Sequence, residues 1–211
     1  MKYIKILSLL LIAGLLLTVL ICGGLYWNLT KNDGKFAREI SASEQELRLD
    51  LVESAKDWLG TQEGSIQHQE ILNIYNNHEP LAQGYPVKPE DNWCATYTSA
   101  MAITCGLTDI IPTECGCERQ VGLWQAIGRW EEDDHYCPLP GDYIYYAWDD
   151  EWKFGNCTGW SDHVGIVVGT SGPFIKVIEG NKDDSVAYRI IFRYHPEIRG
   201  FGLPDFASKT K

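Results

Sequence analysis

The sequence predicts an α+β fold with a mainly antiparallel sheet, because segments with helical periodicity come first and segments rich in β-branched and aromatic residues come later. The chain has 211 residues, of which 45% are hydrophobic and 22% charged, a composition typical of folded proteins. This composition argues against a disordered or low-complexity chain. A chain of this length can bury one substantial core.

A long apolar run at the N-terminus predicts a membrane anchor. Lys2 and Lys5 precede it, and no charged residue occurs over residues 6–30. As a helix, residues 6–27 would span about 33 Å, enough to cross a hydrocarbon core of about 30 Å. We therefore predict that residues 1–30 form an uncleaved single-pass anchor in the cell membrane, with the remainder on the extracytoplasmic side.

Two alternatives for this run are cleavage and lipidation. A cleaved signal peptide has an apolar run of about 7–15 residues and small residues at the cut, whereas this run is longer and lacks such a site. A lipoprotein signal would be cut before Cys22, but Leu20 and Ile21 stand where small residues are usual. The charges that flank the run orient it only weakly, so the extracytoplasmic placement also rests on the chemistry below.

The next residues predict a linker and the first helix of a folded domain. Residues 31–42 are polar and predict a short linker, and residues 43–211 then form one domain. Ser43 and Glu46 have the spacing of a capping box, and apolar residues follow at helical spacing until Gly60. An amphipathic helix is therefore expected between these positions.

The rest of the domain divides into a helical part and a strand part. A short helix is predicted over residues 67–75, and the prolines of residues 76–90 predict a loop. Residues 93–102 are rich in small side chains and lack a helix breaker, which predicts a buried helix. Strands are predicted over residues 143–148, 163–168, 174–179 and 186–193.

The charge balance excludes one class of partner. With 18 basic and 29 acidic residues the net charge is −11, and no basic cluster offsets it locally. A nucleic acid would therefore meet net repulsion, so no nucleic-acid partner is expected. The acidic residues are expected to form a solvated surface that keeps the domain soluble.

Three residues could come together as a catalytic site. Cys94 begins the buried helix, His163 begins a strand, and Glu179 ends the next strand. Two antiparallel strands joined by a turn near residues 169–173 would place His163 beside Glu179. A helix N-terminus lowers the pKa of a thiol, because free backbone N–H groups point at the sulfur.

These residue types suit nucleophilic catalysis on an amide. The imidazole can take the proton of the thiol and later give one to the leaving amine. A carboxylate on the other ring nitrogen fixes the tautomer, and the backbone N–H of Cys94 can help to hold the oxyanion. Taken singly, a buried Cys is more often a core residue, and a His at a strand start is more often a surface group. Their joint order favours the catalytic interpretation.

Five short motifs carry a family resemblance. They are Trp58-Leu-Gly, Asn92-Trp-Cys-Ala, Leu139-Pro-Gly-Asp-Tyr-Ile, His163-Val-Gly-Ile-Val and Glu179-Gly-Asn. On these motifs, residues 53–205 resemble the CHAP family of cysteine amidohydrolases and peptidases, whose members share a papain-like core. The order of the motifs is fairly specific, although each is weak alone.

The resemblance implies roles for four residues and a substrate. Cys94 would be the nucleophile, His163 the general base, Glu179 the residue that orients the imidazole, and Asn181 a supporting polar partner. CHAP enzymes typically cut amide bonds in peptidoglycan, either at the muramoyl–alanine link or within the peptide. The expected function is therefore that of a peptidoglycan amidase or endopeptidase, and Trp160 could line its substrate groove, although a core or rim Trp is more common.

Other functions remain open at this point. The domain could be a non-catalytic module that binds the cell wall within an envelope, secretion or phage-related assembly. It could also be a transglutaminase-like acyl transferase, since such enzymes use the same three residue types with an amine as acceptor.

No cofactor or metal is predicted. Some CHAP enzymes carry a calcium loop before the nucleophile, but residues 83–91 hold too few carboxylates for one.

The five other cysteines of the domain could form at most two disulfides, which are favoured outside the cell. They could instead be core thiols or bind a metal. The remaining histidines are expected at the surface. These cysteines and histidines are Cys105, Cys115, Cys117, Cys137 and Cys157, and His68, His78, His135 and His195.

Overall fold

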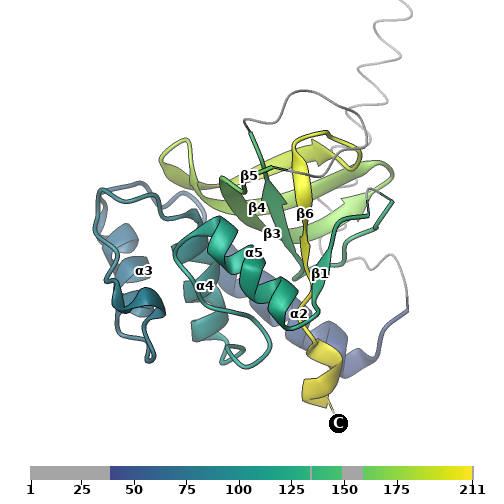
Figure 1. Ribbon diagram of the computed structural model, residues 1–211, viewed down its shortest axis with the longest axis horizontal. Coiled ribbons are helices and arrows are strands. Elements are labelled where there is room, and N and C mark those ends of the chain that lie inside the picture. The colour runs from purple at the N-terminus through teal and green to yellow at the C-terminus, as the bar shows by residue number, and fades with distance from the viewer. Residues whose placement is uncertain (1–38, 134, 149–158, 211) are drawn as a thin grey trace, which may run out of the picture.

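The computed structural model describes residues 39–133, 135–148 and 159–210. This part of the chain has an α+β fold, which confirms the predicted class. Figure 1 shows the helices gathered on one side of the sheet. The four α-helices of the described part are α2 (Ala42–Lys56), α3 (Ile66–Asn76), α4 (Cys94–Thr104) and α5 (Cys117–Ala126).

The described strands form one six-stranded antiparallel sheet in the order β1-β6-β2-β3-β4-β5. The four predicted strands are confirmed as β2 to β5, whereas β1 and β6 were not expected. The strands are β1 (Trp130–Glu131), β2 (Tyr143–Tyr146), β3 (His163–Ser171), β4 (Phe174–Lys182), β5 (Ser185–Phe192) and β6 (Ile198–Gly202), and two 3₁₀ turns are η1 (Ala82–Gly84) and η2 (Phe206–Thr210).

The predicted membrane anchor lies outside the described residues, as does most of the predicted linker. Within the described ranges, no helix has both the length and the apolar character needed to cross a membrane.

The first described helix starts two residues earlier than expected. The cap is Ser41, whose hydroxyl accepts a hydrogen bond from the backbone N–H of Glu44 at 3.1 Å. Ser43 therefore is not the cap, and the prediction of a capping box from Ser43 to Glu46 was wrong. The sequence holds the same pattern two residues earlier, from Ser41 to Glu44.

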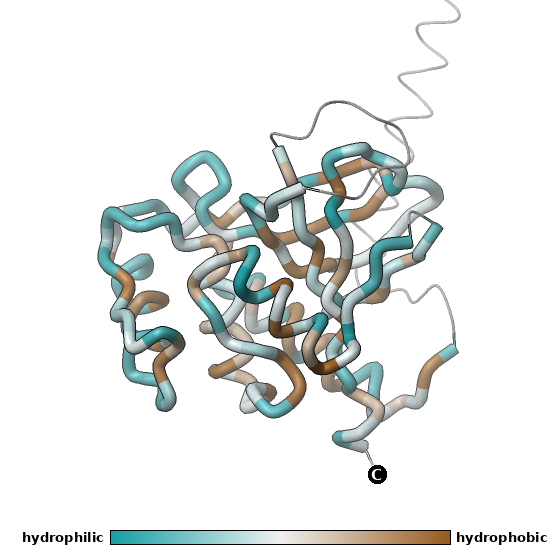
Figure 2. The backbone as a smooth tube through the Cα atoms, viewed as in Figure 1, coloured by the Kyte–Doolittle hydropathy of each residue, from teal (hydrophilic) through white to brown (hydrophobic). Residues whose placement is uncertain are grey.

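Helix α4 is the buried centre of the helical layer. It packs on β3 and β4, and α3 covers another side of it. Its residues from Cys94 to Ala102 are all buried, as predicted, and Figure 2 shows hydrophobic residues along the helix and the central strands. Close packing against the sheet is possible because Gly180 in β4 leaves room for Tyr97 and Trp93. The glycine therefore helps to hold the start of α4 against the end of β4.

Helix α5 and strand β6 were missed in the sequence. Trp124 of α5 lies where a Cβ atom on Gly202 of β6 would stand, so this strand needs a glycine for a tertiary reason. Glycine has a low strand propensity, so the sequence pattern did not indicate a strand at this segment. Helix α5 did have a readable pattern, because its buried residues follow helical spacing: Cys117, Gln120, Val121 and Trp124.

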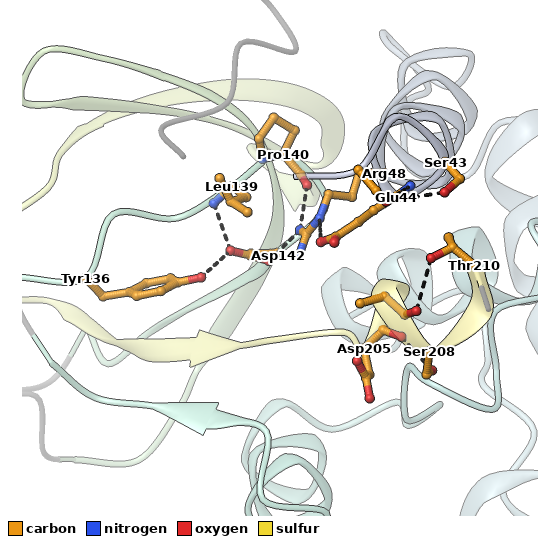
Figure 3. A network of polar contacts seen from close by, with 12 residues as sticks. Ser43, Glu44, Arg48, Tyr136, Leu139, Pro140, Asp142, Asp205, Ser208 and Thr210 are labelled. Atoms are coloured by element: carbon orange, nitrogen blue, oxygen red, sulfur yellow. Dashed lines mark hydrogen bonds and ion pairs between the residues drawn. The ribbon is translucent and has the colours of Figure 1, made fainter. Parts of the chain in front are cut away.

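The Pro-Gly-Asp turn before β2 is tied to α2 through a buried ion pair. Asp142 accepts hydrogen bonds from the Leu139 backbone N–H at 2.8 Å and from the Tyr136 hydroxyl at 2.7 Å. Its other oxygen lies 2.8 Å from Nη1 of Arg48, which is 4% exposed (Figure 3). Gly141, which precedes Asp142 in this turn, has a φ of +85°, a backbone conformation that favours glycine. This motif of the sequence therefore holds the scaffold together, away from the candidate site.

Candidate active site

The β3–β4 hairpin brings His163 and Glu179 together. The register pairs Ile166 with Ile178, so the start of β3 lies beside the end of β4. His163 Nε2 lies 3.1 Å from Oε2 of Glu179, as the sequence predicted. Gly165 makes this approach possible, because a Cβ atom there would stand 2.7 Å from Cγ of Glu179.

Glu179 is fully buried, and three side chains donate to its carboxylate. Besides His163, the Tyr146 hydroxyl donates at 2.9 Å, and Nε of Arg189 lies 2.7 and 2.9 Å from the two oxygens. Burial alone would raise the pKa of the Glu179 carboxyl, but the contacts with His163 and Arg189 outweigh burial and hold the pKa below its usual value. The carboxylate therefore stays charged beside the imidazole.

A small aromatic stack covers this ion pair. Tyr146 and Trp148 lie face to face with centroids 4.6 Å apart, and the Arg189 guanidinium lies 4.9 Å from the Trp148 ring. Trp148 also lies 6.0 Å from the His163 ring. The aromatic rings limit water access to the pair and hold Arg189 by a cation–π contact. The sequence analysis did not predict that Tyr146, Trp148 and Arg189 would surround this pair.

Cys94 is the first residue of α4, as predicted, and it is 4% exposed. No side chain caps this helix at Trp93, and the backbone N–H of Ala95 points at the sulfur. The thiol is also hydrogen-bonded with Cys117 and His163. The contact with Cys117, joined by those with His163 and Ala95, overcomes the effect of burial and lowers the pKa of the Cys94 thiol well below its usual value.

The His163 imidazole completes a hydrogen-bonded chain from sulfur to carboxylate. Since Nε2 faces Glu179, Nδ1 is the ring nitrogen left to face Cys94. Burial alone would lower the pKa of His163, but the contacts with Cys94 and Glu179 outweigh it and raise the pKa to about 9. Both shifts favour a thiolate beside an imidazolium, the form in which a cysteine is nucleophilic.

Cys117 is a feature of the site that was not singled out from the sequence. It is the first residue of α5, and its sulfur lies 3.5 Å from that of Cys94. The N-termini of two helices therefore meet at the two sulfurs, and both favour negative charge there. The hydrogen bond with Cys94, together with burial, raises the pKa of the Cys117 thiol well above its usual value, so Cys117 stays protonated and donates.

A cleft of about 320 Å³ opens beside Cys94 and Cys117. Trp160 lines it and is 70% exposed, and a role in substrate binding stays a prediction. Charges of both signs also line the cleft. They are Glu118, Arg119 and Asp162, and the neutral polar Asn92 lies beside them.

Asn181 stands apart from the chain of Cys94, His163 and Glu179. Its amide donates to Oδ1 of Asn92 at 3.2 Å, and within the described part of the chain it makes no hydrogen bond to His163 or Glu179. Since Asn92 lines the cleft two residues before Cys94, Asn181 supports the edge of the cleft.

Comparisons with protein-family models, with curated proteins and with solved structures found no match for this chain. The geometry of the cleft is therefore the basis for a functional assignment.

The remaining cysteines and histidines differ in part from expectation. Cys105, Cys115, Cys117 and Cys137 are free thiols, so the favoured disulfides do not form among these four, and Cys157 lies outside the described residues. Among the described residues, no three metal-binding side chains form a site.

His68 was expected at the surface but is 1% exposed and packs against Trp93, with ring centroids 4.6 Å apart. Its Nδ1 accepts a hydrogen bond from the Gly64 backbone N–H, and burial lowers its pKa. The polar residues around it in the sequence hid this burial, which comes from packing against a residue 25 positions away in the chain.

Proposed function

We propose that this protein is a cysteine hydrolase that cuts an amide bond of peptidoglycan. The observation that carries the proposal is the hydrogen-bonded chain of Cys94, His163 and Glu179, of which Cys94 lines an open cleft. A thiolate, an imidazolium and an orienting carboxylate are the groups that acyl transfer through a cysteine requires.

The reaction follows from these positions. The Cys94 thiolate adds to the carbonyl carbon of the amide, and the negative charge that forms on oxygen is held by the backbone N–H of Cys94 at the start of α4. The His163 imidazolium gives its proton to the leaving nitrogen, the C–N bond breaks, and the amine departs. A thioester between the acyl group and Cys94 remains.

Hydrolysis of the thioester restores the site. Neutral His163 takes a proton from a water molecule, whose oxygen attacks the thioester carbon. The C–S bond breaks, the acid leaves, and Cys94 returns as the thiolate. Throughout both steps Glu179 holds the imidazole in one orientation and favours its protonated form, because it is buried, charged and bonded to Nε2.

The choice of peptidoglycan rests on the resemblance of residues 53–205 to the CHAP family, whose papain-like core we propose for this domain. The cleft is compatible with a peptide, since Trp160 offers an exposed apolar surface while Arg119 and Asp162 offer charges of both signs. An N-terminal anchor over residues 1–30 would hold the enzyme at the membrane, where its wall substrate is concentrated. Envelope or secretion machinery would then be its natural partners.

The test is digestion of purified peptidoglycan by the full chain under mild reductant, with fragments identified by mass spectrometry. We expect fragments whose release is lost in Cys94→Ala. Cys105→Ala is the matched control, because Cys105 caps the opposite end of the same helix and its substitution should leave release intact. The masses of the fragments distinguish an amidase from an endopeptidase.

Other results would overturn the proposal. Unchanged release by Cys94→Ala would exclude a cysteine mechanism. Wall binding by a folded protein without new amines or acids would indicate a binding module. Incorporation of an added amine into the acyl product, in place of water, would indicate an acyl transferase.

A further inference from the structure

Hydrolysis needs one cysteine, yet the cleft holds two. The sulfurs of Cys94 and Cys117 lie 3.5 Å apart, and no other side chain stands between them at this distance. Both thiols line the same cleft and are otherwise well buried, at 4% and 7% exposed. A small molecule that enters the cleft therefore reaches both sulfurs together.

The distance is short enough for a covalent bond. A disulfide has its sulfurs about 2.05 Å apart, so the two atoms need to close by about 1.5 Å. Each cysteine is the first residue of its helix, where its own backbone N–H has no acceptor within the helix. Small adjustments at two helix starts can therefore supply the movement.

The two thiols differ in pKa, as the two cysteines of a redox pair do. The contact between the two sulfurs lowers the pKa of the Cys94 thiol well below its usual value and raises that of Cys117 well above it, which favours the thiolate at Cys94. An oxidant therefore reacts first at Cys94, because the thiolate is the nucleophile. Once Cys94 is oxidised it no longer holds Cys117 protonated, and the second sulfur becomes free to react.

We propose that Cys94 and Cys117 form a reversible intramolecular disulfide when a peroxide enters the cleft, so that the dithiol is a redox-modification site. This proposal goes beyond the hydrolytic function and does not depend on it, since it rests on the position of two sulfurs and on the difference between their thiols.

The steps balance with a peroxide as oxidant. The Cys94 sulfur attacks one oxygen of hydrogen peroxide, the O–O bond breaks, and a sulfenic acid and water form after proton uptake. Cys117 loses its proton and attacks the Cys94 sulfur, the S–O bond breaks, and the oxygen leaves as a second water. Two electrons pass from the thiols to the peroxide, and a dithiol such as dithiothreitol returns them by exchange.

The disulfide would have two consequences for the cleft. It removes the Cys94 thiolate, so every reaction that uses this nucleophile stops until a thiol reductant is present. It also protects Cys94, because a sulfenic acid without a neighbouring thiol reacts with a second peroxide to give sulfinic acid and water, and dithiothreitol does not reverse this step.

The test treats the full chain with one equivalent of hydrogen peroxide and then unfolds it in acid and labels free thiols with N-ethylmaleimide. Cleavage after glutamate separates Cys94 in residues 91–114 from Cys117 in residues 115–118. A Cys105→Ser/Cys115→Ser background leaves one thiol in each fragment. In the unsubstituted chain, fragmentation of the same linked peptides in the mass spectrometer assigns the bond.

We expect the two fragments to be joined and unlabelled after peroxide, and separate and labelled after dithiothreitol. In Cys117→Ser treated with excess peroxide, Cys94 should instead gain two oxygens as a sulfinic acid and stay oxidised after dithiothreitol. A folded protein in which Cys94 is oxidised while Cys117 remains free for labelling would overturn the proposal. So would a bond from Cys94 to another cysteine in the unsubstituted chain. Since the readout is the state of the protein's own cysteines and no wall substrate is used, a failure here is distinct from a failure of hydrolysis.

Discussion

Gly180 in β4 packs against Tyr97 in α4 so closely that a Cβ atom on the glycine would lie 2.5 Å from Cβ of Tyr97. The same atom would lie 3.0 Å from Trp93, the residue before Cys94. This contact sets how near the start of α4 lies to the end of β4. The position of the nucleophile relative to the imidazole therefore depends on a glycine that takes no part in the chemistry.

Replacing this glycine should separate the two halves of the site. Gly180→Ala forces α4 away from the sheet, and overpacking of this kind costs about 1–3 kcal/mol of folding free energy. We expect a lower midpoint in urea unfolding and slower alkylation of Cys94. Gly122→Ala is the control, since its Cβ meets nothing within 4 Å and alanine favours a helix. Equal stability of Gly180→Ala and the unsubstituted protein would contradict this account of the packing.

Removing the charge of Glu179 should lower the pKa of the His163 imidazole. In Glu179→Gln the side chain keeps its shape but no longer attracts a proton to His163, so the pKa of His163 should fall from about 9. Loss of a positioned acid–base group of this kind slows hydrolysis by about 10²-fold or more. The measurement is kcat together with NMR titration of His163. Asp183→Asn, at an exposed carboxylate near the end of β4, should change neither.

Arg189 should stabilise the fold through the buried carboxylate. Arg189→Met leaves Glu179 without its cationic donor, and a lost hydrogen bond to a charged group costs about 1.5–3 kcal/mol. Because the pKa of Glu179 is depressed, this stabilisation is present above the ordinary carboxyl range and is lost as pH falls through the depressed value. The difference in unfolding free energy between Arg189→Met and the unsubstituted protein, measured by urea unfolding, should therefore be largest at pH 7 and smaller in acid.

A matched change at the surface gives the comparison for Arg189. Lys209 pairs with the exposed Asp109 at 2.9 Å, and such pairs contribute about 0–1 kcal/mol. Lys209→Met should therefore have a small effect at either pH. A loss for Lys209→Met as large as that for Arg189→Met would argue against a special role of the buried carboxylate.

The reactive ion pair should produce a bell-shaped pH profile. The pKa of Cys94 is well below its usual value and that of His163 is raised to about 9, so the thiolate–imidazolium pair exists between the two. Hydrolysis should decline as pH rises through about 9, where His163 loses the proton that the leaving amine needs. A rate that rises steadily through this range would show that a neutral imidazole acts instead.

Cys117 should help to hold the Cys94 thiolate. Cys117→Ala removes a donor that lies 3.5 Å from the sulfur, so the pKa of Cys94 should rise. Cys117→Ser keeps a donor and should restore part of the shift. The measurement is the rate of Cys94 alkylation by iodoacetamide against pH, with Cys137→Ser as the control. Identical profiles for the alanine and serine variants would show that donation from Cys117 has no effect.

Much of the candidate site could be predicted because its parts are local in sequence. His163 and Glu179 meet because a hairpin with a short turn has only one register that buries its apolar residues. Cys94 could be placed at a helix start because small residues without a breaker follow it. Alternation along strands and the composition of a helix are properties that a single segment carries by itself.

The sequence by itself determined the α+β class, the four long strands, and the order of a cysteine, a histidine and an acid. Only the tertiary structure placed Cys117, Arg189 and Tyr146 around them. These three residues lie on three other elements, and no local pattern relates α5, β5 and β2 to one another. Their side chains meet because apolar faces of distant segments pack together, and that packing is a property of the whole chain.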